Sequence, residues 1–133
     1  MFTRNWFFAG LIFGLSTSLA GAEGDSKKGE RVFKKCKACH QIGEGAKSRT
    51  GPILTGIIDA SAGIDPDFGY SDALKAAAED GLVWNQDALT AFLTKPRDFL
   101  PKTKMSFSGL RKEKDIDDLL AYLQTFESDV KDD

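Results

Sequence analysis

The pentapeptide Cys36-Lys37-Ala38-Cys39-His40 contains both cysteines and the single histidine of this 133-residue chain. C-x-x-C-H is the attachment sequence for c-type haem, in which each thiol forms a thioether with the macrocycle and the adjacent histidine binds the iron. A helical turn ending here would put both sulfur atoms at the haem rim and the imidazole beneath its centre. The motif therefore predicts one covalent haem on Cys36 and Cys39, with His40 as an axial ligand.

Three other interpretations of the motif stay open at this point. A thioredoxin-type thiol pair would follow a strand in a βαβ unit, whereas the segment before Cys36 has the pattern of a helix. A structural zinc site needs four nitrogen or sulfur ligands, and two cysteines with one histidine supply three. A disulfide is possible in an oxidising compartment, but it would not explain the adjacent histidine.

Residues 1–22 have the features of a secretory signal peptide. Arg4 precedes an apolar run from Trp6 to Leu15, and Ala20-Gly21-Ala22 is a small-residue cleavage site. A membrane anchor needs roughly 20 apolar residues, and the polar residues 16–18 interrupt the run too early. We expect export to the periplasm with cleavage after about Ala22, and no membrane insertion after cleavage. The mature domain is then expected at 23–133, with a frayed acidic tail at 127–133.

The composition is that of one globular domain. Apolar residues make up 41% and charged residues 29% of the chain, and the net charge is -2, which excludes a strongly basic nucleic-acid binder. A mature chain of this size buries only a modest core. We therefore expect another group, such as a haem, to complete the interior.

The helical signals predict an all-α fold, because no segment alternates as a strand does. Two long loops, residues 41–70 and 96–111, are expected to wrap around something. Capping and stop signals bound four helices: from Asp25 or Ser26 to about Lys37, from Asp72 to Glu79 after Ser71, from Asn85 to Pro96, and a last helix with Ile116, Leu119, Leu120 and Leu123 on one face.

Met105 is the only methionine besides the initiator, in the segment Pro101-Lys102-Thr103-Lys104-Met105-Ser106-Phe107. Because no second histidine exists, the sixth iron ligand is either Met105 or no protein group. Thioether ligation raises the reduction potential and closes the iron to exogenous substrates, which favours a carrier over an enzyme. The alternatives are a core-filling methionine and a haem enzyme or gas sensor with an open iron site.

At these residues the chain resembles the class I soluble cytochromes c, in particular the bacterial cytochrome c2 and c550 group. The resemblance extends from Lys28 to Phe126, with the motifs in family order. After the haem motif come Thr50-Gly51-Pro52-x-Leu54-x-Gly56, Phe68-Gly69-Tyr70-Ser71-Asp72-Ala73, Gly81-Leu82-Val83-Trp84, the methionine segment from Phe99 to Gly109, and Leu119-Leu120-Ala121-Tyr122-Leu123.

The resemblance implies a cytochrome c fold, with short helices and long loops wrapped around one covalent haem. It also implies a single-electron carrier, not an enzyme, between respiratory or photosynthetic complexes. By position, the Pro52 carbonyl would accept a hydrogen bond from His40. Tyr70 and Trp84 would bind a haem propionate, and Phe107 would shield the side near Met105. Gly29 with Phe33 would cross the last helix at Leu119 and Tyr122.

Three departures from the family pattern stand near the expected haem. Asp59-Ala60 replaces a common Gly-Arg pair, which removes a guanidinium that faces a propionate. We therefore expect a more solvated, lysine-compensated or less acidic propionate, and a lower or more pH-dependent potential. Phe92 replaces a common tyrosine near the methionine sulfur, and Lys102 replaces a common glycine.

The ligand-bearing segments are basic. Residues 23–51 contain eight Lys and Arg against four Asp and Glu, and residues 95–114 contain seven against two. Such a charge distribution would orient encounters with an acidic partner: a quinol–cytochrome c oxidoreductase, an oxidase, a reaction centre or a periplasmic dehydrogenase. We expect a monomer that binds no nucleic acid. The lysines expected around the haem edge are Lys35, Lys37, Lys47, Lys95, Lys102 and Lys104.

Overall fold

The structure is a computed structural model that describes residues 24–127. The expected signal peptide and the tail residues 128–133 lie outside the described residues. Within the described part, the only strand-like pairing is an isolated antiparallel bridge between Ser61 and Val83. The expected all-α fold is therefore confirmed. The helices are α1 (Ser26–Phe33), α2 (Asp72–Glu79), α3 (Gln86–Thr94), α4 (Pro96–Phe99) and α5 (Glu113–Gln124).

Three helices begin at the residues that the sequence predicts. The Asp25 side chain accepts hydrogen bonds from the backbone N–H groups of Lys27 and Lys28 at the start of α1. Ser71 caps α2 and Asn85 caps α3 in the same way. Each cap gives a partner to N–H groups that have none within the helix.

The end of α1 differs from the prediction, and Pro96 has a second role besides following the end of α3. The first helix ends at Phe33 and not near Lys37, because the chain continues in tight turns through residues 34–39. Pro96 does not simply end a helix: it is the first residue of α4. Proline suits that position because the N–H group that it lacks would have no intrahelical partner there.

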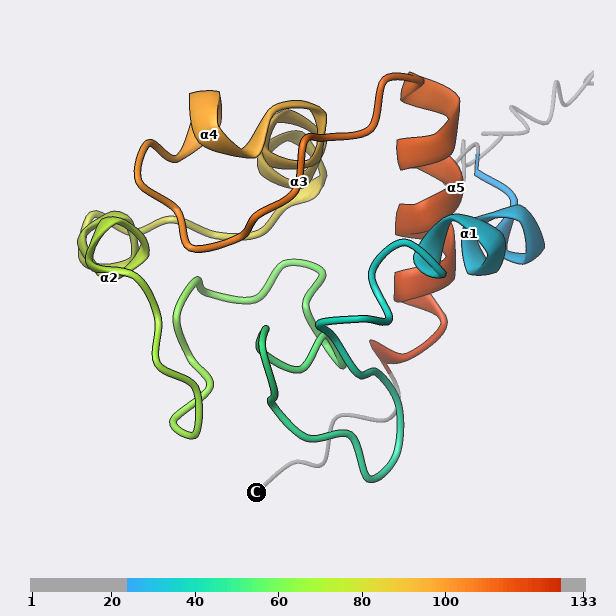
Figure 1. Ribbon diagram of the computed structural model, residues 1–133. Coiled ribbons are helices and arrows are strands. Elements are labelled where there is room, and N and C mark those ends of the chain that lie inside the picture. Colours follow the sequence, from blue (N-terminus) through green and yellow to red (C-terminus); the bar gives the residue numbers. More distant parts are fainter. Residues whose placement is uncertain (1–23, 128–133) are drawn as a thin grey trace, which may run out of the picture.

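Helices α1 and α5 cross on one side of the molecule, and α2, α3 and α4 lie on the other (Figure 1). Gly29 of α1 is buried at the crossing, where a Cβ would overlap the carbonyl oxygen of Asp118 and lie 2.8 Å from the Cβ of Tyr122. The rings of Phe33 and Tyr122 pack with centroids 5.3 Å apart. Residues 40–70 run below these helices in the view of Figure 1, from the side of α1 to the side of α2.

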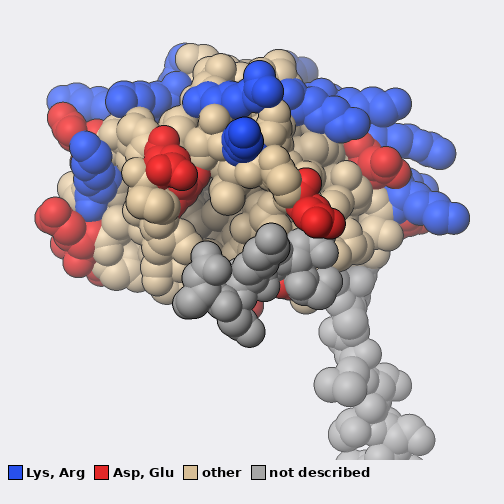
Figure 2. Space-filling view, turned by 90° about the horizontal axis from the view of Figure 1, so that it is seen from below, with Lys and Arg blue, Asp and Glu red and all other residues tan. Residues whose placement is uncertain are grey.

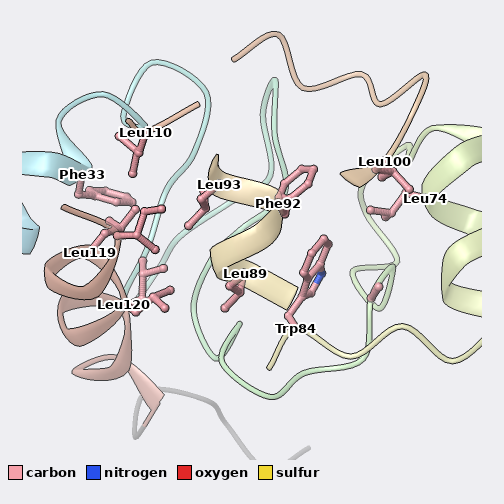
Figure 3. Packing of buried hydrophobic residues seen from close by; sticks show 13 residues of the cluster. Phe33, Leu74, Trp84, Leu89, Phe92, Leu93, Leu100, Leu110, Leu119 and Leu120 are labelled. Carbon is pink, nitrogen blue, oxygen red and sulfur yellow. The ribbon is translucent and has the colours of Figure 1, made fainter. Parts of the chain in front are cut away.

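The buried side chains converge from both groups of helices on one interior (Figure 3). Phe33 and Leu119 approach from α1 and α5, while Leu89 and Phe92 approach from α3. The helix α5 residues expected on one face, from Ile116 to Leu123, are all buried at the predicted positions. No helix of residues 24–127 has the length and apolar character needed to cross a membrane.

Candidate haem site

A cavity of about 270 Å³ lies at the centre of this interior, and its wall includes Cys36, Cys39, His40 and Met105. The sequence separates the haem motif from Met105 by most of the domain, yet the fold brings both to one cavity. Most of the remaining wall is apolar and comes from α3, α5 and the loops, including Leu54, Trp84, Leu89, Phe92, Phe107 and Leu119.

The two cysteines reach the cavity through the turns that follow α1. The N–H of Cys36 bonds to the Phe33 carbonyl at 2.8 Å, and the N–H of His40 bonds to the Cys36 carbonyl at 2.9 Å. Both thiols are free; Cys36 is half-buried and Cys39 is exposed. Burial raises the pKa of the Cys36 thiol, and the nearby Cys39 adds to that rise while Lys35 opposes it.

His40 is oriented by the loop that follows the motif. Its Nδ1 lies 2.7 Å from the carbonyl oxygen of Pro52. Because a carbonyl only accepts, Nδ1 holds the proton, and the lone pair is on Nε2. Burial lowers the pKa of His40, and the Pro52 hydrogen bond only partly opposes that shift. The imidazole is thus neutral at neutral pH, the form that binds a metal.

Gly51 leaves room for this imidazole. A Cβ at position 51 would lie 2.7 Å from Nδ1 and 2.8 Å from Nε2 of His40. The N–H of Gly51 also bonds to the Cys39 carbonyl at 2.8 Å, which ties the loop to the haem motif. The family motif contains Gly51, but its role in making room for the ring was not foreseen from the sequence.

Met105 lies in an irregular segment after α4. The N–H of Met105 bonds to the Thr103 hydroxyl at 3.3 Å, and the N–H of Phe107 bonds to the Met105 carbonyl at 3.0 Å. Met105 is half-buried and lines the cavity together with Thr103 and Phe107. A polar segment thus places a thioether at an apolar cavity.

The two residues expected to bind a haem propionate differ in their position relative to the cavity. Trp84 is 6% exposed and lines the cavity, with its ring 5.0 Å from that of Phe92. Tyr70 is not part of the cavity wall; its ring packs edge-on against the cavity-lining Phe68, at a centroid distance of 4.9 Å. The Tyr70 oxygen accepts the N–H of Asp65 at 3.0 Å, which leaves the hydroxyl hydrogen available for another acceptor.

Two polar contacts between distant parts of the chain have no signal in the sequence. The Ser48 hydroxyl donates to the carboxylate of Asp65. Glu127, at the end of the described chain, accepts the N–H of Ile58 at 3.3 Å. Polar residues are common in loops, so nothing in the sequence signals either pairing.

The geometry distinguishes the open interpretations of the motif. Within residues 24–127, no group of three His, Cys, Asp or Glu side chains could hold a metal ion, so a zinc site has no support. The described chain also lacks the βαβ unit of a thioredoxin-type protein. A haem fits the residues present: two free thiols, an imidazole with its Nε2 lone pair available and a thioether share one largely apolar cavity.

A helical domain with C-x-x-C-H on the wall of such a cavity defines a c-type haem protein. The comparisons agree, since the family model described as cytochrome c matches residues 26–127. The chain belongs to the cytochrome c family. It therefore has one covalently attached haem c as its cofactor, and it is an electron carrier and not an enzyme.

Individual relatives place it among the bacterial members. It is 52% identical over 101 residues to cytochrome c2 of Agrobacterium tumefaciens (strain II Chrys), covering 76% of this chain and 91% of that protein. It is 49% identical to cytochrome c-550 of Ancylobacter novellus, covering 77% and 95%. The structure of cytochrome c2 from Rhodospirillum centenum superposes with a TM-score of 0.73 at 44% identity, covering 77% of this chain and 98% of that one.

Proposed function

We propose that the chain is a periplasmic single-electron carrier whose haem iron is bound by His40 and Met105. The observation that supports this ligand pair is that the neutral, oriented imidazole and the thioether line the same cavity as both thiols. When bound, the haem supplies one-electron chemistry at its iron. The residues of this chain hold it, keep the ligand geometry fixed and exclude water.

The apolar wall favours this activity. A rigid, dry surrounding reduces the rearrangement that accompanies a change of charge. Phe92 and Trp84 pack against each other on one part of the wall. Electron transfer needs no acid–base pair, since neither a proton nor a covalent bond is exchanged with a substrate.

The test of the ligand pair is an absorption spectrum of protein produced with haem-attachment machinery, compared with Met105→Ala. We expect wild type to be coloured, of the mass of chain plus haem, and slow to bind carbon monoxide when reduced. Met105→Ala should bind carbon monoxide readily. Ser106→Ala, a neighbouring cavity residue without sulfur, is the control and should behave as wild type. Rapid binding to wild type would indicate an open-site sensor or enzyme.

A basic surface would dock the redox partner. Lys35 and Lys104 line the cavity, and the other four lysines expected around the haem edge, Lys37, Lys47, Lys95 and Lys102, are exposed. Lys and Arg side chains form a band along one edge of the face in Figure 2, and the Asp and Glu side chains lie below this band, several of them beside its ends. This arrangement supports a partner with an acidic docking surface in a respiratory or photosynthetic chain.

Export and cleavage after about Ala22 complete the proposal. The mass of the mature protein tests it, because cleavage there leaves Glu23 as the first residue. A periplasmic product that retains residues 1–22 would argue against cleavage.

For the haem propionates, we propose Tyr70 and Trp84 as hydrogen-bond donors. The missing guanidinium at Ala60 supports a potential that depends on pH. A redox titration over about pH 5 to 9 tests it, and a flat profile would contradict it.

A further inference from the structure

The peptide group between Pro52 and Ile53 is hydrogen-bonded on both sides. Its carbonyl oxygen accepts the Nδ1 proton of His40 at 2.7 Å. Its N–H donates to the hydroxyl oxygen of Ser48 at 3.3 Å. The Ser48 hydroxyl in turn donates to the carboxylate of Asp65. A continuous chain of hydrogen bonds therefore connects the His40 ring with a carboxylate in a different loop.

All the donors in this chain point the same way, from the imidazole toward Asp65. Hydrogen bonds arranged in series polarise one another, and a bond to a carboxylate is stronger than one between neutral groups. When the Ser48 oxygen attracts the Ile53 N–H proton, more electron density stays on the amide, and the Pro52 oxygen becomes a better acceptor. The Nδ1 hydrogen bond of a metal-binding histidine controls both its orientation and its basicity.

Asp65 is itself held in place at the end of the chain. Its Oδ1 accepts the N–H of Asp67 at 3.0 Å, and its own N–H donates to the Tyr70 hydroxyl oxygen at 3.0 Å. The residue is half-buried, and its side chain forms no ion pair with any Lys or Arg of residues 24–127. The carboxylate at the end of the hydrogen-bond chain thus has no Lys or Arg of the described chain at ion-pair distance.

We propose that Asp65 is a positioning residue for the haem ligand. Through Ser48 and the Pro52–Ile53 peptide, its negative charge strengthens the hydrogen bond to His40 and makes Nε2 a stronger donor to iron. A stronger donor favours the more positive ferric state, so the chain lowers the reduction potential. This inference rests on the proposed function, because it requires His40 to bind the iron.

The experiment must distinguish an effect of the Asp65 charge that is transmitted through the hydrogen bonds from a direct electrostatic effect on the haem. Asp65→Asn removes the charge and keeps the shape. Ser48→Ala breaks the chain and leaves the charge, while Ser48→Thr restores a hydroxyl. Asp67→Asn is the matched control, since it removes a charge from the same exposed loop but its side chain has no part in the hydrogen-bond chain.

The first readout is the reduction potential of the holoprotein. We expect Asp65→Asn and Ser48→Ala each to raise it, changing the ratio of oxidised to reduced protein at fixed potential at least twofold, about 18 mV for one electron. Ser48→Thr and Asp67→Asn should change the ratio by less than half as much. The double variant Asp65→Asn with Ser48→Ala should raise the potential little more than either single variant does, since both substitutions break the same hydrogen-bond chain.

The second readout does not depend on redox activity. In the reduced protein, the Nδ1 proton resonance of His40 should move upfield in Asp65→Asn and Ser48→Ala, as its hydrogen bond weakens, and stay in place in Asp67→Asn. Exchange of the Ile53 amide proton should accelerate in Ser48→Ala.

Two results would overturn the proposal. If Ser48→Ala leaves the potential unchanged while Asp65→Asn and Asp67→Asn raise it equally, the charge acts through space. If all variants bind haem covalently and none changes in potential or in the Nδ1 resonance, the hydrogen-bond chain has no effect and the proposed function stands. A wild-type protein without haem would refute the proposed function itself, and this inference with it.

Discussion

Gly29 of α1 lies directly against the backbone carbonyl of Asp118 in α5, with no room for a side chain between them. One turn later, Phe33 packs its ring on Tyr122 of α5. Phe33 and Leu119, from the same two helices, also line the haem cavity. The close approach at Gly29 therefore sets the position of one wall of the site.

We expect Gly29→Ala to lower the free energy of unfolding by about 3 kcal/mol, the upper part of the range for overpacking a well-packed interface. The added methyl would overlap helix backbone, which cannot rotate away as a side chain can. Urea denaturation measures the change. Gly69→Ala is the control, because nothing lies within 4 Å of a Cβ at that position. Equal stability of the two variants would show that α1 and α5 separate without cost.

Asp118 is a buried carboxylate at the same helix crossing, 3% exposed. It accepts the N–H of Asp25 at 2.7 Å and the ammonium of Lys114 at 2.5 Å. The Asp25 hydrogen bond, followed by that from Lys114, lowers the pKa of Asp118. A carboxyl whose pKa is lower in the folded than in the unfolded protein stabilises the fold at pH values above its unfolded-state pKa. This stabilisation is lost as the pH falls through the folded-state pKa.

Asp118→Asn should therefore lower the melting temperature at neutral pH, and the difference from wild type should shrink as the pH falls below about 4. At low pH the wild-type carboxyl is protonated and resembles the amide. Melting curves over this pH range test the expectation. Asp117→Asn, a neighbouring change on α5, should show no such trend. A difference from wild type that stays constant with pH would contradict the assigned ionised state.

Local chemistry made three helix starts predictable, whereas the end of α1 and the start of α4 depended on context. Asp25, Ser71 and Asn85 cap helices as side chains of their type commonly do. The lysine-rich segment after Phe33 has good helical propensity, yet it turns there to present the cysteines to the cavity. Pro96 is compatible with either a helix end or a helix start, and only the packing of α4 selects the second.

The site was predictable where its residues are scarce. Two cysteines, one histidine and one internal methionine leave few combinations, and all four line one cavity. The contact between Ser48 and Asp65 could not be predicted, since it depends on the paths of two irregular loops. The position of Tyr70 against Phe68 depends on those paths as well.

Lysines at the cavity should accelerate docking. We expect Lys104→Gln to slow association with an acidic redox protein about threefold at low ionic strength. Electrostatic steering by all the lysines together accelerates association roughly 10-fold or more, and Lys104 contributes part of this. Stopped-flow kinetics at several salt concentrations measure it, and the effect should fade as salt rises. The control is Lys75→Gln in α2, an exposed lysine outside the cavity wall. An equal effect of Lys75→Gln would indicate net charge and not a docking surface.

Asp59 and Lys102 are the two non-glycine residues of the described chain with positive φ, 60° and 67°. Both stand where the cytochromes c that the chain resembles commonly have glycine. Aspartate tolerates the left-handed conformation better than lysine does. The strain of the left-handed backbone is therefore greater at Lys102, three residues before Met105.

Lys102→Gly should relieve this strain. The left-handed conformation costs a side-chain-bearing residue about 1–2 kcal/mol, and the greater freedom of glycine in the unfolded chain offsets part of the gain. We expect a net stabilisation of about 0.5–1 kcal/mol in urea denaturation. With Met105 as the proposed iron ligand, cyanide should also displace it more slowly, because the segment opens less often. Lys102→Ala distinguishes relief of backbone strain from loss of the lysine charge, since alanine keeps the strain and removes the ammonium. It should match wild type in both measurements, and a gain equal to that of glycine would trace the effect to the lysine charge.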